Sequence, residues 1–267
     1  MSRPISPRTV LEAFLPFNGE ASLAEVYETA NLAGIPDQTL RLAIRRLVAS
    51  GDATQMGRGR AGTLTLTRNG RLRLERDRRS LSLAFAQDAG RAPWDGRWRL
   101  IAVSIPERER SLRDTLRREL TELGAAAIST SLYASPHDLA AEITDAAGRY
   151  VSTATTDDLN VAGTTDPKVI AETLWPSRGT VDAYATLEDS LDRDAADTST
   201  PAVVRMLILA DALELAIRHD PLLPPELRSA PWTPSTVRAA WAARWEALSE
   251  QASNETAVRV FPDFQET

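Results

Sequence analysis

The hydrophobic pattern of residues 23–51 predicts two helices joined by a short turn. Leu23, Val26 and Ala30 recur at helical spacing, so the first helix has one buried stripe. Residues 34–37 interrupt it, and Asp37 is the expected N-cap of a second helix that ends at Gly51. The apolar side of that second helix comprises Leu40, Ile44, Leu47 and Val48. Its opposite side is mainly polar and carries Gln38, Arg41, Leu42 and Arg45.

A glycine-rich basic turn at residues 56–62 follows, between two short strand-like runs at residues 53–55 and 63–66. Glycines permit a tight turn and a close approach of the backbone to a ligand. A turn that serves only packing has little use for two unpaired cations, Arg58 and Arg60. Helix, turn, helix and basic hairpin in this order predict a winged helix-turn-helix that binds double-stranded DNA. The expected DNA contacts are Gln38, Thr39, Arg41, Arg45, Arg46, Arg58 and Arg60. The alternative is a small helical domain whose arginines are merely solvated.

A different pattern follows a helix at residues 69–85 and a linker at 89–93. Strands are predicted at 98–105, 127–134 and 150–155, and they alternate with helices at 109–123 and 136–147. Alternating strands and short helices of this length are typical of a ferredoxin-like α+β unit. Further helices are predicted at 167–175, 180–191, 202–217 and 236–249, with a polar loop at 192–200.

The predicted fold class is therefore α+β, with three domains. An N-terminal winged helix with a linker helix spans 1–88, and a central ferredoxin-like domain spans 94–156, with an extension to about 180 left open. A mainly helical C-terminal domain spans 157–267.

Charge is distributed unevenly along the chain. The formal net charge is −6, yet residues 1–80 carry 13 arginines against 8 acidic residues. The sequence contains no cysteine, which excludes disulfides and thiolate metal sites. No apolar run is long enough to span a bilayer, and the first residues lack a hydrophobic signal region, so we expect a cytoplasmic protein without membrane contact. The two histidines, His137 and His219, are far apart and are expected to be surface or capping residues. No catalytic residue, metal ligand or cofactor motif is predicted.

Three segments together resemble the PaaX-like transcriptional regulators, named for the repressor of bacterial phenylacetate degradation. They are residues 34–71 (from GIPDQTLRLAIRRL to the basic turn), 94–136 (WDGRWRLIAVSIPERER and the helix after it) and 219–232 (HDPLLPPELRSAPW). The resemblance implies a homodimeric repressor of a catabolic operon, with the same three domains, that an aromatic acyl-CoA or related effector releases from DNA.

The resemblance also implies a central domain similar to a CRISPR adaptation nuclease. Those enzymes place an aspartate at the end of the first strand to hold a divalent cation, whereas Ser104 stands at that position here. A hydroxyl does not replace the carboxylate that a hard cation requires. We therefore expect no nuclease activity and assign this domain a scaffold or dimerisation role.

Aromatic and cationic residues concentrate where the linker meets the first central strand. The candidate effector-binding residues are Trp94, Arg97, Trp98 and Arg99, because tryptophan stacks on a flat acyl group and arginine binds phosphate. Alternatively, both tryptophans pack a domain interface. For the whole chain, the alternative to a repressor is a protein–protein adaptor whose winged helix no longer binds specific DNA.

Overall fold

The computed structural model describes residues 4–143 and 145–252, so the outer ends of the predicted first and last domains lie outside the described residues. The described residues combine helices with two antiparallel sheets, which confirms the α+β class. By packing, the chain divides into two units. Unit 1 comprises residues 1–82, 186–214 and 237–267, and unit 2 comprises 83–185 and 215–236. The predicted division into three domains stays a prediction.

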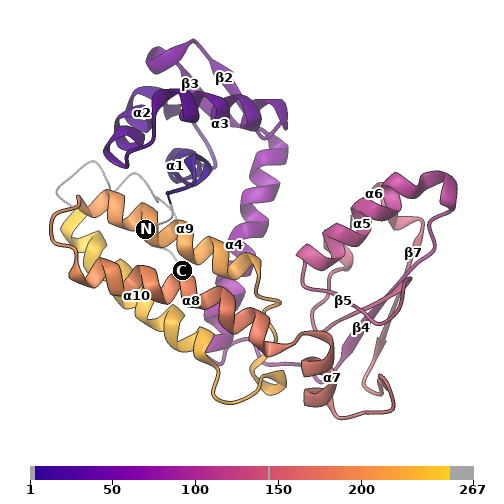
Figure 1. The fold of residues 1–267 in the computed structure, drawn as a ribbon. Helices are drawn as coiled ribbons and strands as arrows, with labels where there is room; N and C mark the ends of the chain where they lie inside the picture. The colour runs from indigo at the N-terminus through magenta and orange to yellow at the C-terminus, as the bar shows by residue number, and fades with distance from the viewer. Residues whose placement is uncertain (1–3, 144, 253–267) are drawn as a thin grey trace. The chain divides into compact units, whose positions relative to one another are not determined.

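The N-terminal part of unit 1 contains three helices and a small sheet. Helices α1 (Pro7–Phe14), α2 (Leu23–Leu32) and α3 (Asp37–Ala49) are accompanied by β1 (Ala21–Ser22), β2 (Ala53–Met56) and β3 (Thr63–Leu66). The strands pair antiparallel in the order β1-β3-β2, and Figure 1 shows β2 and β3 as neighbours. Leu11, Leu23, Leu40 and Leu64 are buried between these elements.

The expected hydrophobic stripes of α2 and α3 are present with two corrections. Val48 is 37% exposed, so the buried side of α3 consists of Leu40, Ile44 and Leu47. Asp37 is the first helical residue and not the cap, since Pro36 holds the cap position without a side-chain hydrogen bond.

Unit 1 also contains parts of four long helices: α4 (Arg68–Asp88), α8 (Ser177–Ala196), α9 (Ala202–Arg218) and α10 (Thr233–Ala252). Trp241 and Trp245 of α10 are buried and stacked, with ring centroids 4.8 Å apart. The indole Nε1 of Trp241 donates to the carbonyl of Leu209 in α9. This tryptophan stripe therefore packs inside the chain.

The polar loop predicted at 192–200 is wrong in its first half, because α8 continues to Ala196. The buried carboxylate of Asp194 explains the longer helix. It accepts from Nε of Arg205 at 2.7 Å and also pairs with Arg244. Such long-range ion pairs leave no trace in the local composition, which looks like that of a loop.

Unit 2 is built on a second antiparallel sheet. Its strands are β4 (Trp98–Val103), β5 (Ala126–Ala127), β6 (Leu132–Ser135) and β7 (Val151–Thr156), in the order β5-β6-β4-β7. Helices α5 (Arg110–Glu122) and α6 (Asp145–Gly148) lie on one face (Figure 1). On that face Ile101, Leu116 and Leu120 belong to one core.

A second core covers the other face of this sheet. Trp98 and Ala134 pack there with Ile170 of α7 (Pro167–Leu174) and with Leu223 and Leu227. The last two belong to residues 219–232, one of the three segments that carry the family resemblance. β4 therefore contributes side chains to cores on both of its faces.

Two predicted central elements are wrong in detail. The strand predicted at 127–134 is two strands, because the amides of Ile128 and Ser129 both donate to the carbonyl of Leu132 and close a turn. The helix predicted at 136–147 is a short 3-10 turn (Ala140–Glu142) followed by α6. Ser135 and Asp138 accept hydrogen bonds from nearby backbone amides, and such local bonds compete with helix formation.

Candidate nucleic-acid interface

Helix α3 has one face in the core of unit 1 and one face in solvent. Leu40, Ile44 and Leu47 are 0%, 3% and 6% exposed. The helical residues predicted to contact DNA are all exposed: Gln38, Thr39, Arg41, Arg45 and Arg46. Within the described residues, these three arginines make no salt bridge or side-chain hydrogen bond. Three unneutralised guanidinium groups on one helix face form a surface suited to phosphates and base edges.

The turn between β2 and β3 needs its glycines for its backbone conformation, as predicted. Gly57 and Gly59 have φ values of +73° and +58°, a conformation that other residues rarely adopt. A Cβ atom on Gly62 would lie 2.8 Å from the carbonyl oxygen of Met56. The glycines thus hold a tight turn that presents Arg58 and Arg60 to solvent.

Arg60 connects this turn to the first residue of α3. Its Nη2 lies 3.3 Å from the carboxylate of Asp37, and its guanidinium lies 5.2 Å from the ring centroid of Tyr27. The expectation of an unpaired cation is therefore wrong for Arg60. Arg58 makes no salt bridge or hydrogen bond with the described residues. Because the Arg60–Asp37 pair is exposed, it contributes less than about 1 kcal/mol and is easily exchanged for a phosphate contact.

The start of α4 packs against the turn that ends α3, a contact that the sequence did not predict. Thr67 accepts a hydrogen bond from the amide of Gly70 and donates one to the carbonyl of Gly51. A Cβ atom on Gly70 would lie 2.0 Å from the carbonyl oxygen of Asp52. A glycine between polar residues in a predicted helix was the available signal. The close approach fixes α4 against the turn that ends α3.

The residues predicted to bind an effector have different environments in unit 2. Trp98 is 1% exposed and lies between two other tryptophans. Its ring centroid is 5.2 Å from that of Trp94 and 6.1 Å from that of Trp175. Arg97 is exposed. In this conformation the indole of Trp98 packs in the core of unit 2, and its role in binding an effector stays a prediction.

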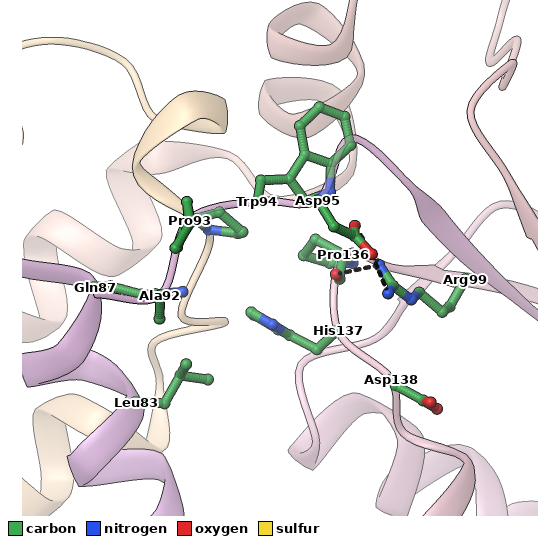
Figure 2. Close-up of a pocket in the computed structure, with 11 residues that line it drawn as sticks. Leu83, Gln87, Ala92, Pro93, Trp94, Asp95, Arg99, Pro136, His137 and Asp138 are labelled. Carbon is green, nitrogen blue, oxygen red and sulfur yellow. Dashed lines mark hydrogen bonds and ion pairs between the residues drawn. The ribbon is translucent and has the colours of Figure 1, made fainter. Parts of the chain in front are cut away.

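Trp94 and Arg99 line a pocket of about 240 Å³ together with Asp95, His137 and Gln87. In Figure 2 the imidazole of His137 points toward Gln87 and Ala92, while Arg99 points toward Asp95. The Arg99 guanidinium donates to both carboxylate oxygens of Asp95, at 2.8 and 2.5 Å, and to the carbonyl of Pro136. The hydrogen bonds that Asp95 accepts from Arg99 lower the pKa of its carboxyl. An anionic ligand here would compete with an ionised carboxylate for Arg99.

His137 is the pocket residue whose environment the sequence analysis did not foresee. Its Nε2 lies 2.8 Å from the carbonyl oxygen of Leu222, which also accepts from Gln87 Nε2 at 2.7 Å. Because a carbonyl only accepts, we assign the proton to Nε2. Burial lowers the pKa of His137, and the positive charges of Arg99 and Arg228 act in the same direction. The neutral imidazole therefore joins the loop after β6 to the segment around Leu222.

Ser104 lies directly after β4, at the position where the resemblance implies a metal-binding aspartate in the nucleases. Its amide and its hydroxyl both donate to the carbonyl of Tyr150, at 2.9 and 3.1 Å. The side chain is exposed and bonded to backbone. Within the described residues, no group of three or more histidine, cysteine or acidic side chains is arranged to hold a metal ion. None of the described helices is long and apolar enough to cross a membrane.

Comparisons with known proteins identify the middle of the chain. Residues 91–168 match the family model of the PaaX protein central Cas2-like domain. Among solved structures, uncharacterized protein Rv0674 from Mycobacterium tuberculosis is similar with a TM-score of 0.59 and 22% sequence identity. The similarity covers 94% of this chain and 99% of that one, so the likeness of fold extends over nearly the whole length of both. No curated protein matches the chain in sequence.

Proposed function

We propose that the chain is a PaaX-like DNA-binding transcriptional repressor, a proposal supported in its middle part by the match of residues 91–168 to the central Cas2-like domain of PaaX proteins. The observation that carries this proposal is the exposed arginine face of α3 beside the basic turn. An α-helix fits the major groove, and arginine is the commonest side chain to recognise guanine there. Arg58 and Arg60 in the turn would contact phosphates on the flanking backbone.

The order of elements in both units supports the proposal. In unit 1 the order α1, β1, α2, α3, β2, β3 with the sheet β1-β3-β2 is that of a winged helix-turn-helix. In unit 2 the order β4, α5, β5, β6, α6, β7 with the sheet β5-β6-β4-β7 is that of a ferredoxin-like domain. We assign the ferredoxin-like domain no nuclease activity, since Ser104 donates a hydrogen bond to the carbonyl of Tyr150 and supplies no carboxylate for a metal ion.

The test starts from an operator, obtained by selecting duplexes from a random pool with the full-length protein and by assaying DNA next to its own gene. Arg45→Ala should weaken operator binding by about 1–3 kcal/mol while sparing non-specific binding, because a base contact is lost. Arg58→Ala and Arg60→Ala should instead weaken binding to all duplexes and reduce the salt slope by about one each.

Arg178→Ala is the matched control for these variants. Its side chain is 91% exposed on α8, so the substitution removes the same charge outside the proposed interface. Its operator affinity should remain within about twofold of the parent after correction for net charge. Unchanged operator affinity in all three interface variants would rule out this arginine surface as the DNA interface, and failure to select any duplex would favour the adaptor alternative.

We further propose that an aromatic acyl-CoA or a related catabolite binds beside Trp94 and releases the repressor from a catabolic operon. The pocket offers an indole and a guanidinium, although a phosphate must displace Asp95 from Arg99. An inducer must bind the DNA-incompetent state more tightly than the competent one, since equal affinity shifts no population.

The effector is tested by titrating phenylacetyl-CoA, other acyl-CoAs and free CoA while following tryptophan fluorescence and operator occupancy. Trp94→Phe should remove most of the fluorescence change and retain operator binding. Trp175 is the other neighbour of Trp98, and Trp175→Phe is the control that should keep the fluorescence change. If no acyl-CoA alters either signal at millimolar concentration, the effector proposal fails and the DNA-binding proposal stands.

A further inference from the structure

The centre of the exposed face of α3 is apolar. At 100° per residue, Leu42 lies almost opposite the buried stripe of Leu40, Ile44 and Leu47. It is 45% exposed, whereas those three are at most 6% exposed. Single leucines on a surface are common, so exposure alone says little. The position of Leu42 is more informative.

Leu42 lies between four of the side chains that we propose as DNA contacts. In a helix the neighbours of a residue are three and four positions away. For Leu42 these are Gln38, Thr39, Arg45 and Arg46, and all four are exposed. A helix that places this surface in a major groove therefore directs Leu42 at the base edges, with cations on one side of it and polar side chains on the other.

The chemistry of the groove determines which base edge Leu42 tolerates. A leucine neither donates nor accepts a hydrogen bond, so it would bury the polar edge of guanine, adenine or cytosine without a partner. Thymine alone presents an apolar group in the major groove, its C5 methyl. Contact between this methyl and the leucine removes both from water and leaves no polar group unpaired.

We infer that Leu42 contacts the C5 methyl of a thymine and selects thymine at one position of each operator half-site. This inference rests on the proposed function, because it requires α3 to enter the major groove. It adds a specificity-determining residue that forms no hydrogen bond, and it distinguishes the contribution of Leu42 from those of the surrounding arginines.

The experiment combines a protein change with the removal of one methyl group from the DNA. In the operator selected above, each thymine is replaced singly by deoxyuridine, which lacks the C5 methyl and keeps the same hydrogen-bonding groups. The affinities of the parent and of Leu42→Ala are measured for every such duplex. Alanine has the highest helix propensity, so the exposed substitution should preserve α3, and circular dichroism checks this.

The expected result is one thymine in each half-site at which deoxyuridine weakens the parent about fourfold, the value of one buried methyl group. At that position Leu42→Ala should bind thymine and deoxyuridine duplexes equally well. Leu32→Ala is the control, because Leu32 is 58% exposed at the end of α2 and outside α3. It should retain the full preference for thymine.

Two results would overturn the inference alone. One is deoxyuridine affecting the parent and Leu42→Ala equally at every position, and the other is deoxyuridine having no effect anywhere. In both cases an operator has been selected, so the proposed function stands. Failure to select any duplex with the parent protein would instead overturn the proposed function, and the inference with it.

Discussion

At the scale of single residues, the buried carboxyl of Glu12 in α1 has a strongly raised pKa. Its side chain is 10% exposed and accepts from Arg8 Nε and Arg73 Nη2, each at 2.7 Å. Burial raises the pKa of Glu12 to about 7, against the opposing effect of Arg8 and with help from the negative charges of Glu214 and Asp77. The folded protein therefore holds a proton on Glu12 at pH values where the unfolded chain has released it.

This proton makes stability depend on pH in a definite direction. Between the unfolded pKa of 4.5 and the folded value of about 7, the unfolded chain has lost the Glu12 proton while the folded protein still holds it. Rising pH in this range therefore favours the unfolded chain and lowers the free energy of unfolding. The decrease should reach at most roughly 3 kcal/mol, since one pKa unit corresponds to about 1.4 kcal/mol. Urea unfolding at pH 5, 6, 7 and 8 measures it. Glu12→Gln, which remains neutral, should show a smaller decrease, and equal pH dependence of the two proteins would contradict the assignment.

Individual residues also show what sequence alone can predict about the site. The exposure of Arg41 and Arg45 follows from helical periodicity, because the apolar stripe fixes which face is buried. The pairing of Arg60 with Asp37 does not follow, because 23 residues separate them and their proximity depends on how the turn folds against α3. The burial of Trp98 depends likewise on α7 and on residues around Leu223, which are distant in sequence.

At the scale of elements, the contact between α4 and the turn after α3 rests on Gly70. An alanine within a helix is normally more stable than a glycine by about 1 kcal/mol. At Gly70 the added Cβ would lie 2.0 Å from the backbone oxygen of Asp52, which cannot rotate away as a side chain would. We therefore expect Gly70→Ala to lower the free energy of unfolding by about 1–3 kcal/mol.

Gly179→Ala in α8 provides the matched control for this substitution. No heavy atom lies within 4 Å of a Cβ built there, so the normal helical preference should apply and the variant should equal or exceed the parent in stability. Thermal unfolding of the three proteins, followed by circular dichroism, gives the comparison. A Gly70→Ala protein as stable as Gly179→Ala would show that the close approach relaxes without cost.

Elements were predictable where one chain segment determines its own pattern. Helices α3 and α5 have clear apolar stripes, and both agree with the expected ranges within a few residues. The end of α8 and the split of 127–134 into β5 and β6 were not predictable. The first depends on the pairing of Asp194 with Arg205, and the second on a turn of small polar residues that also have strand propensity.

At the scale of the whole molecule, charge and assembly bear on the proposed DNA binding. Residues 1–80 have five more arginines than acidic residues, while the chain as a whole is at −6. In the proposed repressor, the acidic remainder would oppose non-specific association with DNA and leave specificity to the arginine surface. Under this proposal one α3 helix would make few base contacts, and two half-sites would approximately double the interaction free energy.

We therefore expect a two-fold dimer in solution. The tryptophan stripe of α10 does not supply its interface, because Trp241 and Trp245 are 2% and 8% exposed within the chain. Sedimentation equilibrium at micromolar concentration should give about twice the chain mass of 29.2 kDa.

The selected operator should contain inverted half-sites whose centres are about 10–10.5 base pairs apart, or a multiple of that distance. This spacing sets two α3 helices on one side of the duplex. A shift of half-site spacing by five base pairs should abolish cooperative binding by turning one half-site to the opposite side. A species of 29.2 kDa that binds one chain per operator, indifferent to that shift, would contradict the dimer.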